Sequence, residues 1–464
     1  MRVRLVSLGC RLNSGEIDAL ARDFSAVGHC VVASGEDADL MVINTCAVTH
    51  RAGAESRRLI RRFRREYPQA ALVVTGCYAQ LSAHTARALG ADLVVGNQYK
   101  DALPQILHEA GILPSPEPLP YEGLVGVGST VRTRAFLKVQ DGCNNSCTFC
   151  VVTLARGSAR SRAQCDVIAD VNKLVSLGYQ EVVLCGVHLG AYGHDHGRLD
   201  GLQKLVQALL CETDVPRLRL SSLEPWDLQP SFFGLWQDVR LLPHLHLPLQ
   251  SGCDSVLRRM GRRTTCTSFR ALLRSARSAI PDLAISTDVM VGFPGESDVE
   301  FEQSLEFVGS MEFAQMHIFR YSRRIGTLAA DMPGHVPEDV AKHRSSRLHE
   351  LDRCMQSRFR QRFVGRKLSV LWERSRPHDN GLCWSGLTPN YLRVVTHTPK
   401  QLDLHNAVTE TSLLAMVDEG ILGEVVAPLD FVSQRIPVEL ALGVNAAKYL
   451  PSVPQVHEAT SPRA

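Results

Sequence analysis

Residues 140–150 read QDGCNNSCTFC and place Cys143, Cys147 and Cys150 in one short loop. The run AFLKVQ just before the cysteines has the apolar character of a buried strand. Gaps of three and then two residues allow the chain to wrap a single metal centre. A zinc ribbon would need a second close pair of cysteines downstream, which the sequence lacks. The loop therefore predicts a metal centre with three nearby protein ligands at the end of a strand.

Strand-like runs recur after this loop up to about residue 363. Five more begin near residues 181, 217, 244, 284 and 315, and helical stretches such as DVIADVNKLVSLG separate them. Six successive β/α units predict a full or partial barrel of parallel strands over residues 135–363, with ligands at the carboxyl ends of the strands. Residues at those ends are candidates for cofactor or substrate contact, and a plain turn role is equally compatible: Gly186, His188, Gln250, Ser251, Gly292 and Glu296.

The region before the barrel, residues 1–112, also alternates strand and helix patterns. The runs RLVSL, DLMVIN, ALVVT and DLVVG are each followed by a polar or helical stretch, which predicts a doubly wound parallel sheet. Three of these runs end next to a cysteine, namely Cys10, Cys46 and Cys77. The carboxyl ends of parallel strands share one edge, so we expect the three thiols to converge.

Three converging thiols have two interpretations. Buried free cysteines are common in protein cores. Structural zinc sites usually have four ligands, whereas three thiolates leave one position open, which suits an iron–sulfur cluster with a reactive iron. The equivalent placement of the three cysteines favours the metal site.

The remainder of the chain predicts a third domain and two irregular segments. Residues 364–435 carry four strand-like runs, KLSVLWE, GLCWSGLT, YLRVVTH and LGEVVAPLDF, with little helix between them. They predict a small β-barrel of the size of modules that bind single-stranded nucleic acid. A linker rich in proline and glycine occupies residues 113–134, and the tail at 436–464 is expected to be disordered.

Bulk composition places limits on the class of protein. A chain of 464 residues is expected to form two or three domains, and 45% hydrophobic with 21% charged residues is typical of a globular protein. The formal net charge of +3 does not by itself indicate a polyanionic partner. No apolar run reaches the roughly 18 residues that span a bilayer, and the N-terminus reads as a strand, not a signal peptide. We therefore expect a cytoplasmic protein with no membrane association.

One basic helix does suggest an anionic partner. In the segment RRLIRRFRREY the arginines fall within roughly 160° of one helix face, and apolar residues occupy the other. A solvated amphipathic helix is the ordinary interpretation. Arginines without interleaved acids repel one another unless an anion is near, which favours contact with tRNA phosphates. The candidates are Arg57, Arg58, Arg61, Arg62, Arg64 and Arg65, with Arg320, Arg323 and Arg324 as a possible extension.

The loop 143–150, with Phe149 before its last cysteine, resembles the CxxxCxxC motif of the radical S-adenosylmethionine (SAM) superfamily. The resemblance implies a [4Fe–4S] cluster on Cys143, Cys147 and Cys150, whose open iron binds SAM. It also implies a partial (β/α)6 barrel and cleavage of SAM to a 5′-deoxyadenosyl radical. Phe149 and the strand-end residues named above are the candidate cofactor contacts.

Both cysteine trios together resemble the methylthiotransferase family. The matching segments include LGCRLN, NTCAVT, VVTGCYAQ, LHLPLQSGCD, TDVMVGFPGE and FRYSRRIGT, and the C-terminal module resembles an RNA-binding TRAM domain. LGCRLNSGE, VHLGAYG, LRLSSLEP and GLTPNYLRVV are most similar to the branch that converts N6-threonylcarbamoyladenosine at position 37 of tRNA to its 2-methylthio form. Two departures concern substrate detail only: VVTLARGSARSR lacks a usual proline, and Cys185 replaces a usual threonine.

The family resemblance implies a role for each trio. Cys10, Cys46 and Cys77 would hold a second, auxiliary [4Fe–4S] cluster that carries the sulfur to be transferred. One SAM would methylate that sulfur, and a second would supply the radical that activates carbon 2 of the adenine. A flavodoxin- or ferredoxin-type protein is the expected electron donor, and the sulfur donor is not identified.

Other functions remain open at this point. The same chemistry on isopentenyl-modified adenosine, or on an aspartate of a ribosomal protein, differs only in substrate. A non-catalytic iron–sulfur protein that binds RNA and senses redox state explains both trios but not the barrel. A zinc hydrolase is disfavoured, because such sites use histidine or carboxylate ligands and neither trio contains one.

Overall fold

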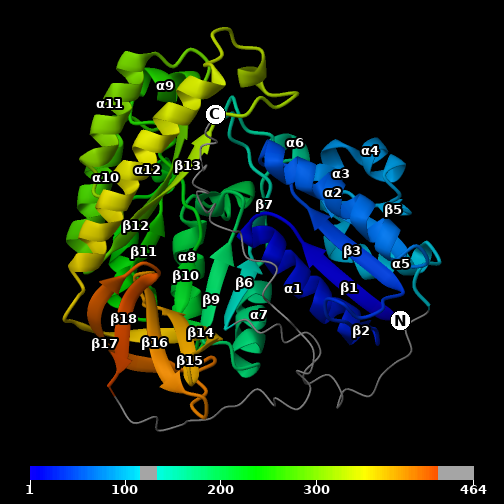
Figure 1. Cartoon of the computed structure of the whole chain (residues 1–464). Helices are drawn as coiled ribbons and strands as arrows, with labels where there is room; N and C mark the ends of the chain where they lie inside the picture. Colours follow the sequence, from blue (N-terminus) through cyan, green and yellow to red (C-terminus); the bar gives the residue numbers. More distant parts are fainter. Residues whose placement is uncertain (115–132, 427–464) are drawn as a thin grey trace, which may run out of the picture.

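The N-terminal unit is a five-stranded parallel sheet with helices on both faces. The computed structural model describes residues 1–114 and 133–426. The elements of this unit are β1 (Arg2–Ser7), α1 (Arg11–Ala26), β2 (Cys30–Val31), β3 (Leu40–Thr45), α2 (His50–Glu66), β4 (Ala71–Gly76), α3 (Cys77–Leu81), α4 (Ala83–Ala88), β5 (Leu93–Val94), η1 (Asn97–Ala102) and α5 (Leu103–Glu109). The strands pair in the order β2–β1–β3–β4–β5, and Figure 1 shows the unit beside the central barrel.

The two faces of this sheet are buried by different helices. Phe24 of α1 and Leu107 of α5 pack with Val42 on one side. Ile60 of α2 packs with Ile43 on the other. Alternate residues of β3 thus point into separate apolar cores, which is why the strand is buried throughout. The predicted doubly wound sheet is confirmed.

The central unit is a partial barrel of six parallel strands. They are β6 (Arg134–Lys138), β9 (Glu181–Cys185), β10 (Leu218–Leu220), β11 (His244–His246), β12 (Ala284–Val291) and β13 (Gln315–Arg320). β10, β9 and β6 form one sheet and β11, β12 and β13 another. The parallel bridge between Ser222 and His246 joins them. No pairing between β6 and β13 occurs in the described parts of the chain, so the predicted partial (β/α)6 barrel is confirmed.

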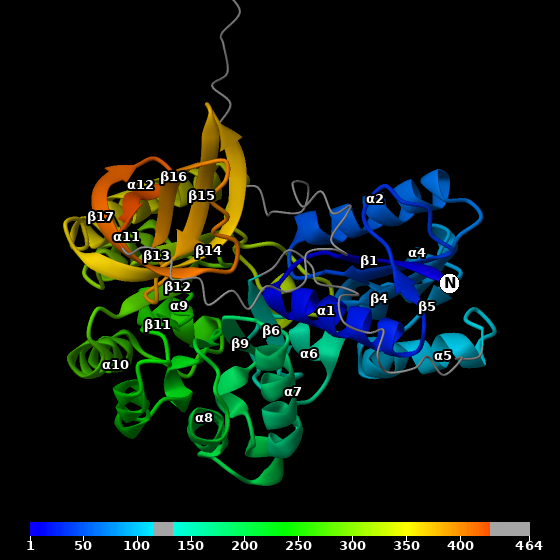
Figure 2. The same cartoon turned by 90° about the horizontal axis from the view of Figure 1, so that it is seen from below.

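Helices cover the outside of this barrel. The longer ones are α7 (Gln164–Ser176), α8 (Gly201–Glu212), α10 (Cys266–Ala279), α11 (Asp298–Gly309) and α12 (Glu338–Gln361). Shorter elements lie in the connections: β7 (Gln140–Asp141), α6 (Val152–Arg156), β8 (Arg160–Ser161), η3 (Leu189–Ala191), η4 (His194–His196), η5 (Pro225–Asp227), η6 (Pro230–Gln237), α9 (Asp254–Arg259) and η7 (Leu328–Ala330). Figure 2 shows α1 of the N-terminal unit beside β6, at the open side of the barrel.

The contact between α1 and β6 is unusually close. A Cβ added to Gly15 of α1 would lie 2.5 Å from the carbonyl oxygen of Phe136 in β6. Only glycine allows the helix backbone to approach the strand at this point. The N-terminal unit therefore packs directly against the edge strand of the barrel.

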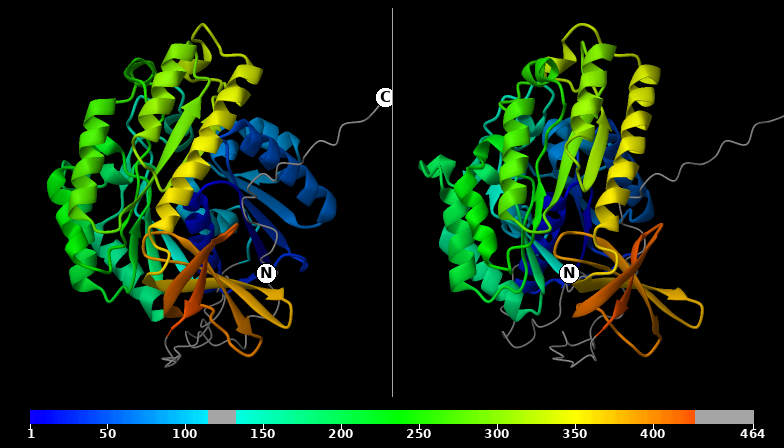
Figure 3. Two further views of the ribbon diagram at one scale, coloured as in Figure 1. Left: turned by 60° about the vertical axis from the view of Figure 1, so that its left-hand side comes forward. Right: turned by 90° about the vertical axis from the view of Figure 1, so that its left-hand side faces the viewer.

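The C-terminal unit is a closed five-stranded barrel at the amino ends of the central strands (Figure 3). Its strands are β14 (Lys367–His378), β15 (Gly381–Leu387), β16 (Arg393–Pro399), β17 (Val408–Val417) and β18 (Gly420–Val425). The predicted small β-barrel is confirmed. The sequence analysis missed β17, whose residues alternate between exposed and buried in its first half before the pattern weakens.

Some predicted segments lie outside the described residues. Most of the linker (115–132), the end of the last predicted strand and the tail 436–464 are among them. The domain boundaries at 112, 134, 363 and 435 therefore stay predictions. In the described parts of the chain, no helix is both long and apolar enough to cross a bilayer.

Candidate active site

Each thiol of loop 143–150 faces a nitrogen. The backbone N–H of Asn145 donates to Cys143 Sγ at 3.4 Å, and that of Val152 donates to Cys150 Sγ at 3.4 Å. Arg262 Nη1 donates to Cys147 Sγ at 3.8 Å. Donors of this kind stabilise a thiolate. The loop therefore places three sulfurs where each can carry negative charge.

Burial opposes that charge while the thiols carry no metal. Desolvation raises the pKa of Cys150 to about 12 and also raises the pKa of Cys147, although Arg262 acts in the opposite direction. Free thiols at this site are therefore protonated near neutral pH. Binding of a metal centre would displace the protons, because thiolates are the ligating form.

A second layer of charged groups supports the loop. His188 Nε2 lies 2.5 Å from Asp227 Oδ2, and its Nδ1 lies 3.9 Å from Cys143 Sγ. Burial favours the neutral imidazole, but the hydrogen bonds to Asp227 and Cys143 outweigh it and raise the pKa of His188 to about 10. Arg262 pairs with Glu224 at 2.6 Å. His188 and Arg262 are thus cationic groups fixed beside two of the sulfurs.

The other predicted strand-end residues have well-defined partners. Gln250 adopts a left-handed φ of 77° and exchanges backbone hydrogen bonds with β12. Ser251 is fully buried, and its hydroxyl accepts from the backbone of Cys253. Gly186 packs tightly in its turn, where an added Cβ would lie 2.9 Å from Leu189. These contacts shape the turns above the barrel.

Two more candidates lie after β12, and Phe149 packs near them. The carboxylate of Glu296 accepts from the Gly292 backbone N–H and from Arg344, both at 2.7 Å. Both hydrogen bonds hold the turn in place. Phe149 meets the buried Phe293 edge to face at 6.5 Å, within an apolar cluster beside the cysteine loop.

The second trio converges as expected from its position on three neighbouring strands. Cys10 follows β1, Cys46 follows β3, and Cys77 begins α3 directly after β4. An added Cβ at Gly9, whose φ is 100°, would lie 2.5 Å from Cys46 Sγ. Burial raises the pKa of Cys46 to about 11, and the nearby Cys10 and Cys77 thiols add to the rise. The three thiols therefore face one another across a short gap.

The spacing of both trios argues against a single zinc ion. Tetrahedral zinc holds thiolate sulfurs about 3.8 Å apart, since Zn–S bonds are about 2.3 Å long. Among the described residues, neither trio has three sulfurs within 4.8 Å of one another. All six ligands are thiols, which suits an iron–sulfur cluster in which each sulfur binds a different iron. Both trios fit a [4Fe–4S] cluster on this evidence.

A buried polar network joins the two trios. Arg156 ends α6, the five-residue helix that follows Cys150. Its guanidinium donates to Glu16 at 2.9 Å and to Asn13 at 2.8 Å, both on α1. Asn13 in turn accepts from Cys10 Sγ at 3.7 Å. One side chain of the barrel unit therefore reaches the loop that carries an auxiliary-site cysteine.

Further contacts strengthen this junction. Asn97 Nδ2 donates to Cys77 Sγ at 3.8 Å and to the Ala155 carbonyl oxygen of α6 at 2.7 Å. Lys100 Nζ donates to Glu16 at 2.7 Å. Burial would raise the pKa of Glu16, but Lys100 and Arg156 outweigh it, so the pKa lies well below its usual range. An ionised carboxylate is therefore buried between two cations.

The sequence analysis missed this network. Asn13 and Glu16 lie within LGCRLNSGE, which was noted only as a family-like segment. Their partner Arg156 lies 140 residues beyond Glu16, so no local pattern links them. Proximity of Arg156 to a cysteine loop was the one available signal.

The basic helix is partly neutralised, contrary to the expectation of arginines without nearby acids. On α2, Arg58 pairs with Glu55 at 3.0 Å, and Arg62 pairs with Glu66 at 2.8 Å. Arg64 pairs with Asp92 and donates to the Gly90 carbonyl oxygen. Arg57 lies over the ring of Tyr78, 5.9 Å from its centre, and Arg61 and Arg65 are exposed. Acids one turn away on the helix, or from a neighbouring loop, thus offset half of the basic face.

Known proteins share this combination of folds. Residues 137–308 match the model of the radical SAM superfamily, and residues 2–96 match one described as an uncharacterized protein family, UPF0004. Among solved structures, the radical SAM methyltransferase TsrM from Kitasatospora setae aligns with a TM-score of 0.54 at 15% identity, covering 71% of this chain and 74% of TsrM. The fold and the three-cysteine loop define a radical SAM protein.

Curated relatives refine this class. The threonylcarbamoyladenosine tRNA methylthiotransferase MtaB of Bacillus subtilis is 36% identical over 84% of this chain and 89% of its own length. MtaB of Thermotoga maritima is 36% identical over 80% and 86%. A tRNA-2-methylthio-N(6)-dimethylallyladenosine synthase of Novosphingobium aromaticivorans is 37% identical over 83% and 89%. The chain belongs to the methylthiotransferase family of radical SAM enzymes, whose cofactors are SAM and [4Fe–4S] clusters.

Proposed function

We propose that this protein adds a methylthio group to carbon 2 of N6-threonylcarbamoyladenosine at position 37 of tRNA. Two trios of cysteines, each leaving one ligand position open and joined through α6, are the observation that carries the proposal. Relatives that bear this activity in their names match most of the chain. The proposed location is the cytoplasm, with a flavodoxin- or ferredoxin-type electron donor.

Each trio is assigned one cluster. Cys143, Cys147 and Cys150 would hold the cluster that binds SAM, and Cys10, Cys46 and Cys77 would hold the auxiliary cluster. When bound, the first group supplies a carbon-centred radical and the second supplies sulfur. His188 and Arg262 keep positive charge against the first set of sulfurs, and Asn13 and Asn97 orient the second. The strand-end residues and Phe149 shape the SAM pocket.

Part of the basic helix would contact tRNA. Arg61 and Arg65 are exposed on α2, whereas Arg58 and Arg62 are paired with acids on the same helix. Replacing Arg61 and Arg65 with glutamine should weaken tRNA binding and reduce its salt dependence by about two phosphate contacts. Binding is measured by filter retention over a range of salt concentrations. The matched control is Arg58→Gln, which removes one paired arginine and should change binding less.

An anaerobic assay tests the reaction. The protein is reconstituted with iron and sulfide, then given dithionite, SAM and tRNA carrying threonylcarbamoyladenosine, and the nucleosides are weighed by mass spectrometry. A methylthio gain that is lost in Cys10→Ala and in Cys143→Ala supports the proposal. Cys354→Ala is the control, because Cys354 is an exposed cysteine of α12.

The same assay decides between substrates. A dimethylallyladenosine synthase is as similar to this chain as the MtaB proteins are, so tRNA carrying dimethylallyladenosine is the second substrate to offer. A gain on that nucleoside alone would replace the proposed substrate. Release of 5′-deoxyadenosine with no change in either nucleoside would point to a substrate outside tRNA. With neither product, about eight irons per chain would favour a redox sensor.

A further inference from the structure

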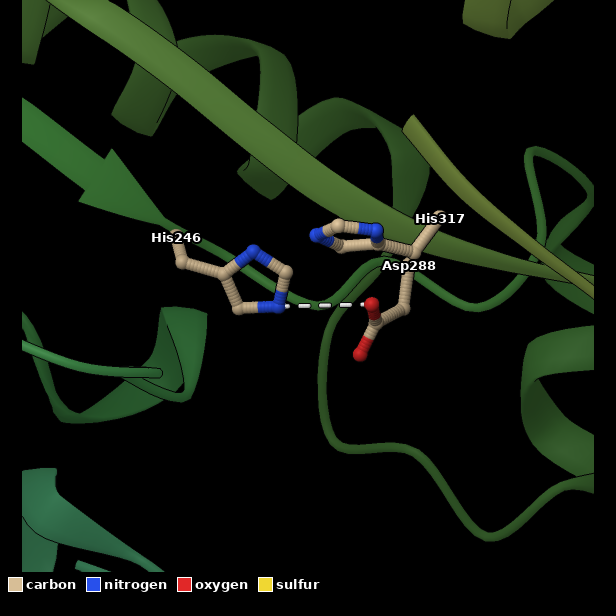
Figure 4. Close-up of side chains that lie close together, drawn as sticks. All are labelled: His246, Asp288 and His317. Carbon is tan, nitrogen blue, oxygen red and sulfur yellow. Dashed lines mark ion pairs between the residues drawn. The ribbon is translucent and has the colours of Figure 1, made fainter. Parts of the chain in front are cut away.

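Three polar side chains meet on the inner face of the barrel. His246, Asp288 and His317 come from the neighbouring strands β11, β12 and β13, and their polar atoms lie within 4.8 Å of one another (Figure 4). We call them the lumen triad. The flanking residues Leu245 and Val289 pack in the core under the helices, so the triad, which alternates with them, faces inward.

The lumen triad lies between the cysteine loop and the C-terminal barrel. Two residues beyond Asp288 on the same strand, Met290 packs in the apolar cluster that contains Phe149 of the cysteine loop. Two residues before His246, His244 stacks on Tyr391 of the C-terminal barrel at 4.6 Å. A molecule that reached the lumen triad would therefore be adjacent to the radical-generating site.

Hydrogen bonds fix the orientation of the triad. His246 Nε2 lies 3.3 Å from Asp288 Oδ1, and His246 Nδ1 lies 2.9 Å from the hydroxyl of Ser286. The same hydroxyl lies 3.2 Å from His244 Nε2. A polar chain thus runs from the stacked Tyr391 to Asp288. Groups held in this way are pre-organised for a ligand.

The triad offers one acceptor beside one donor. Burial would raise the pKa of Asp288, but the hydrogen bond with His246 outweighs it and keeps the carboxylate ionised. Burial and the neighbouring His246 lower the pKa of His317, so its ring is neutral and carries one N–H. In the described parts of the chain, His317 has no hydrogen-bond partner. Asp288 and His317 are direct partners in the register of β12 and β13.

This pair complements one edge of adenine. The base presents N6–H as a donor next to N7 as an acceptor, which is its Hoogsteen edge. A secondary amine at N6 retains one hydrogen, which points towards N7 when the substituent turns towards N1. An anionic acceptor and a neutral donor on adjacent strands can engage both atoms at once. Carbon 2 lies on the opposite side of the ring.

We propose that the lumen triad binds the target adenine by this edge, with Asp288 accepting N6–H and His317 donating to N7. The inference rests on the proposed function and names how that site holds its base. Carbon 2 then points away from β12 and β13, towards the β6 and β9 wall. The cysteine loop follows β6, and Cys10 lies close enough to Cys185 at the end of β9 to affect its ionisation.

A divalent metal ion is the competing ligand. Two imidazoles and a carboxylate are a common ligand set for such ions. Both ring nitrogens of His246 are already within hydrogen-bonding or ion-pair distance of protein groups, which favours binding of a base. Metal content separates the two possibilities.

The test pairs substrate atoms with side chains. An anticodon stem–loop RNA carrying N6-threonylcarbamoyladenosine is compared with its 7-deaza and 3-deaza forms, which lack one ring acceptor each. Affinity for the anaerobic holoenzyme is measured by fluorescence anisotropy, so turnover is not needed. The 7-deaza change should weaken binding to the wild type about tenfold, as expected for one lost hydrogen bond. It should cause no further loss in His317→Phe.

The 3-deaza RNA is the matched control, because N3 lies on the other edge and its removal should affect both proteins equally. Asp288→Asn should also weaken binding of the unmodified RNA, provided that its iron content equals that of the wild type. An equal 7-deaza loss in both proteins would overturn the inference. A third kind of metal, one per chain and absent from Asp288→Asn, would also overturn it. If the wild type does not modify the natural base, it is the proposed function that fails.

Discussion

The two cysteine trios reach similar chemistry by different routes. The first is local, since all three cysteines lie within eight residues of one loop. The second is assembled from the ends of three strands, and it needs the sheet, the turn at Gly9 and the buried Arg156 network to bring its thiols together. A local site tolerates distant changes, whereas an assembled site depends on the tertiary contacts that close it.

The largest expected effect comes from breaking the network. Arg156→Met would leave Glu16 buried with only lysine partners, and removing one member of a buried ionic network costs about 3–5 kcal/mol. The urea midpoint of the apoprotein, followed by circular dichroism, should fall accordingly. Bound iron should drop from about eight to about four per chain while the radical-site cluster is retained.

The matched change is Arg58→Gln on the exposed face of α2. Its partner Glu55 is solvated, so the free energy of unfolding should change by less than about 1 kcal/mol. Loss of both clusters in Arg156→Met would show that the local site also depends on the network, and the contrast between the trios would not hold.

An intermediate effect is expected at Gly9. Alanine there must adopt a φ of 100° and place its Cβ 2.5 Å from Cys46 Sγ. Backbone strain alone costs about 1–3 kcal/mol, and the contact would push apart the two loops. Gly295→Ala in the barrel unit adds similar strain, but the nearest atom is 3.8 Å away. Quantified by Mössbauer spectroscopy, the auxiliary cluster should be depleted only in Gly9→Ala, and equal depletion in both would contradict this prediction.

The smallest effect concerns single donors to sulfur. Asn97→Ala removes an N–H from Cys77, and Arg262→Lys alters the donor to Cys147. A hydrogen bond of this kind contributes about 0.5–1.5 kcal/mol, and its loss should make the potential of the nearby cluster more negative. Redox titration followed by electron paramagnetic resonance should show one shifted cluster in each variant. A shift of both clusters in either variant would mean that the sites are electrically coupled.

The three folded units and the six cysteines could be predicted because their signals are local. Strand runs, turn residues and the position of a cysteine after a strand are all visible within a few residues. The salt bridge of Arg156 with Glu16 and the inward-facing lumen triad depend on contacts across more than a hundred residues or between three strands. For the triad, alternation along HLH and TDV indicated which residues face inward, but attention to strand ends passed over them.

Charge was the property least predictable from the sequence. Six arginines on one helix face indicated a uniform basic surface, yet Arg58 and Arg62 are paired with glutamates on the same helix. Those acids lie three or four residues away, so helical spacing could have revealed them. Asp92, the partner of Arg64, comes from a loop that only the folded sheet brings near.

The short helix α6 has a consequence for how substrate enters. It links Cys150 to the groups around Cys77 within a few residues, and buried ion pairs lock it to α1. A hinge that opened the two units like a clam would have to break those pairs each cycle, at the free-energy cost given above for Arg156. The protein is therefore built to stay shut, and the nucleic acid must do the moving: its target nucleoside leaves the anticodon-loop stack and swings into a preformed slot.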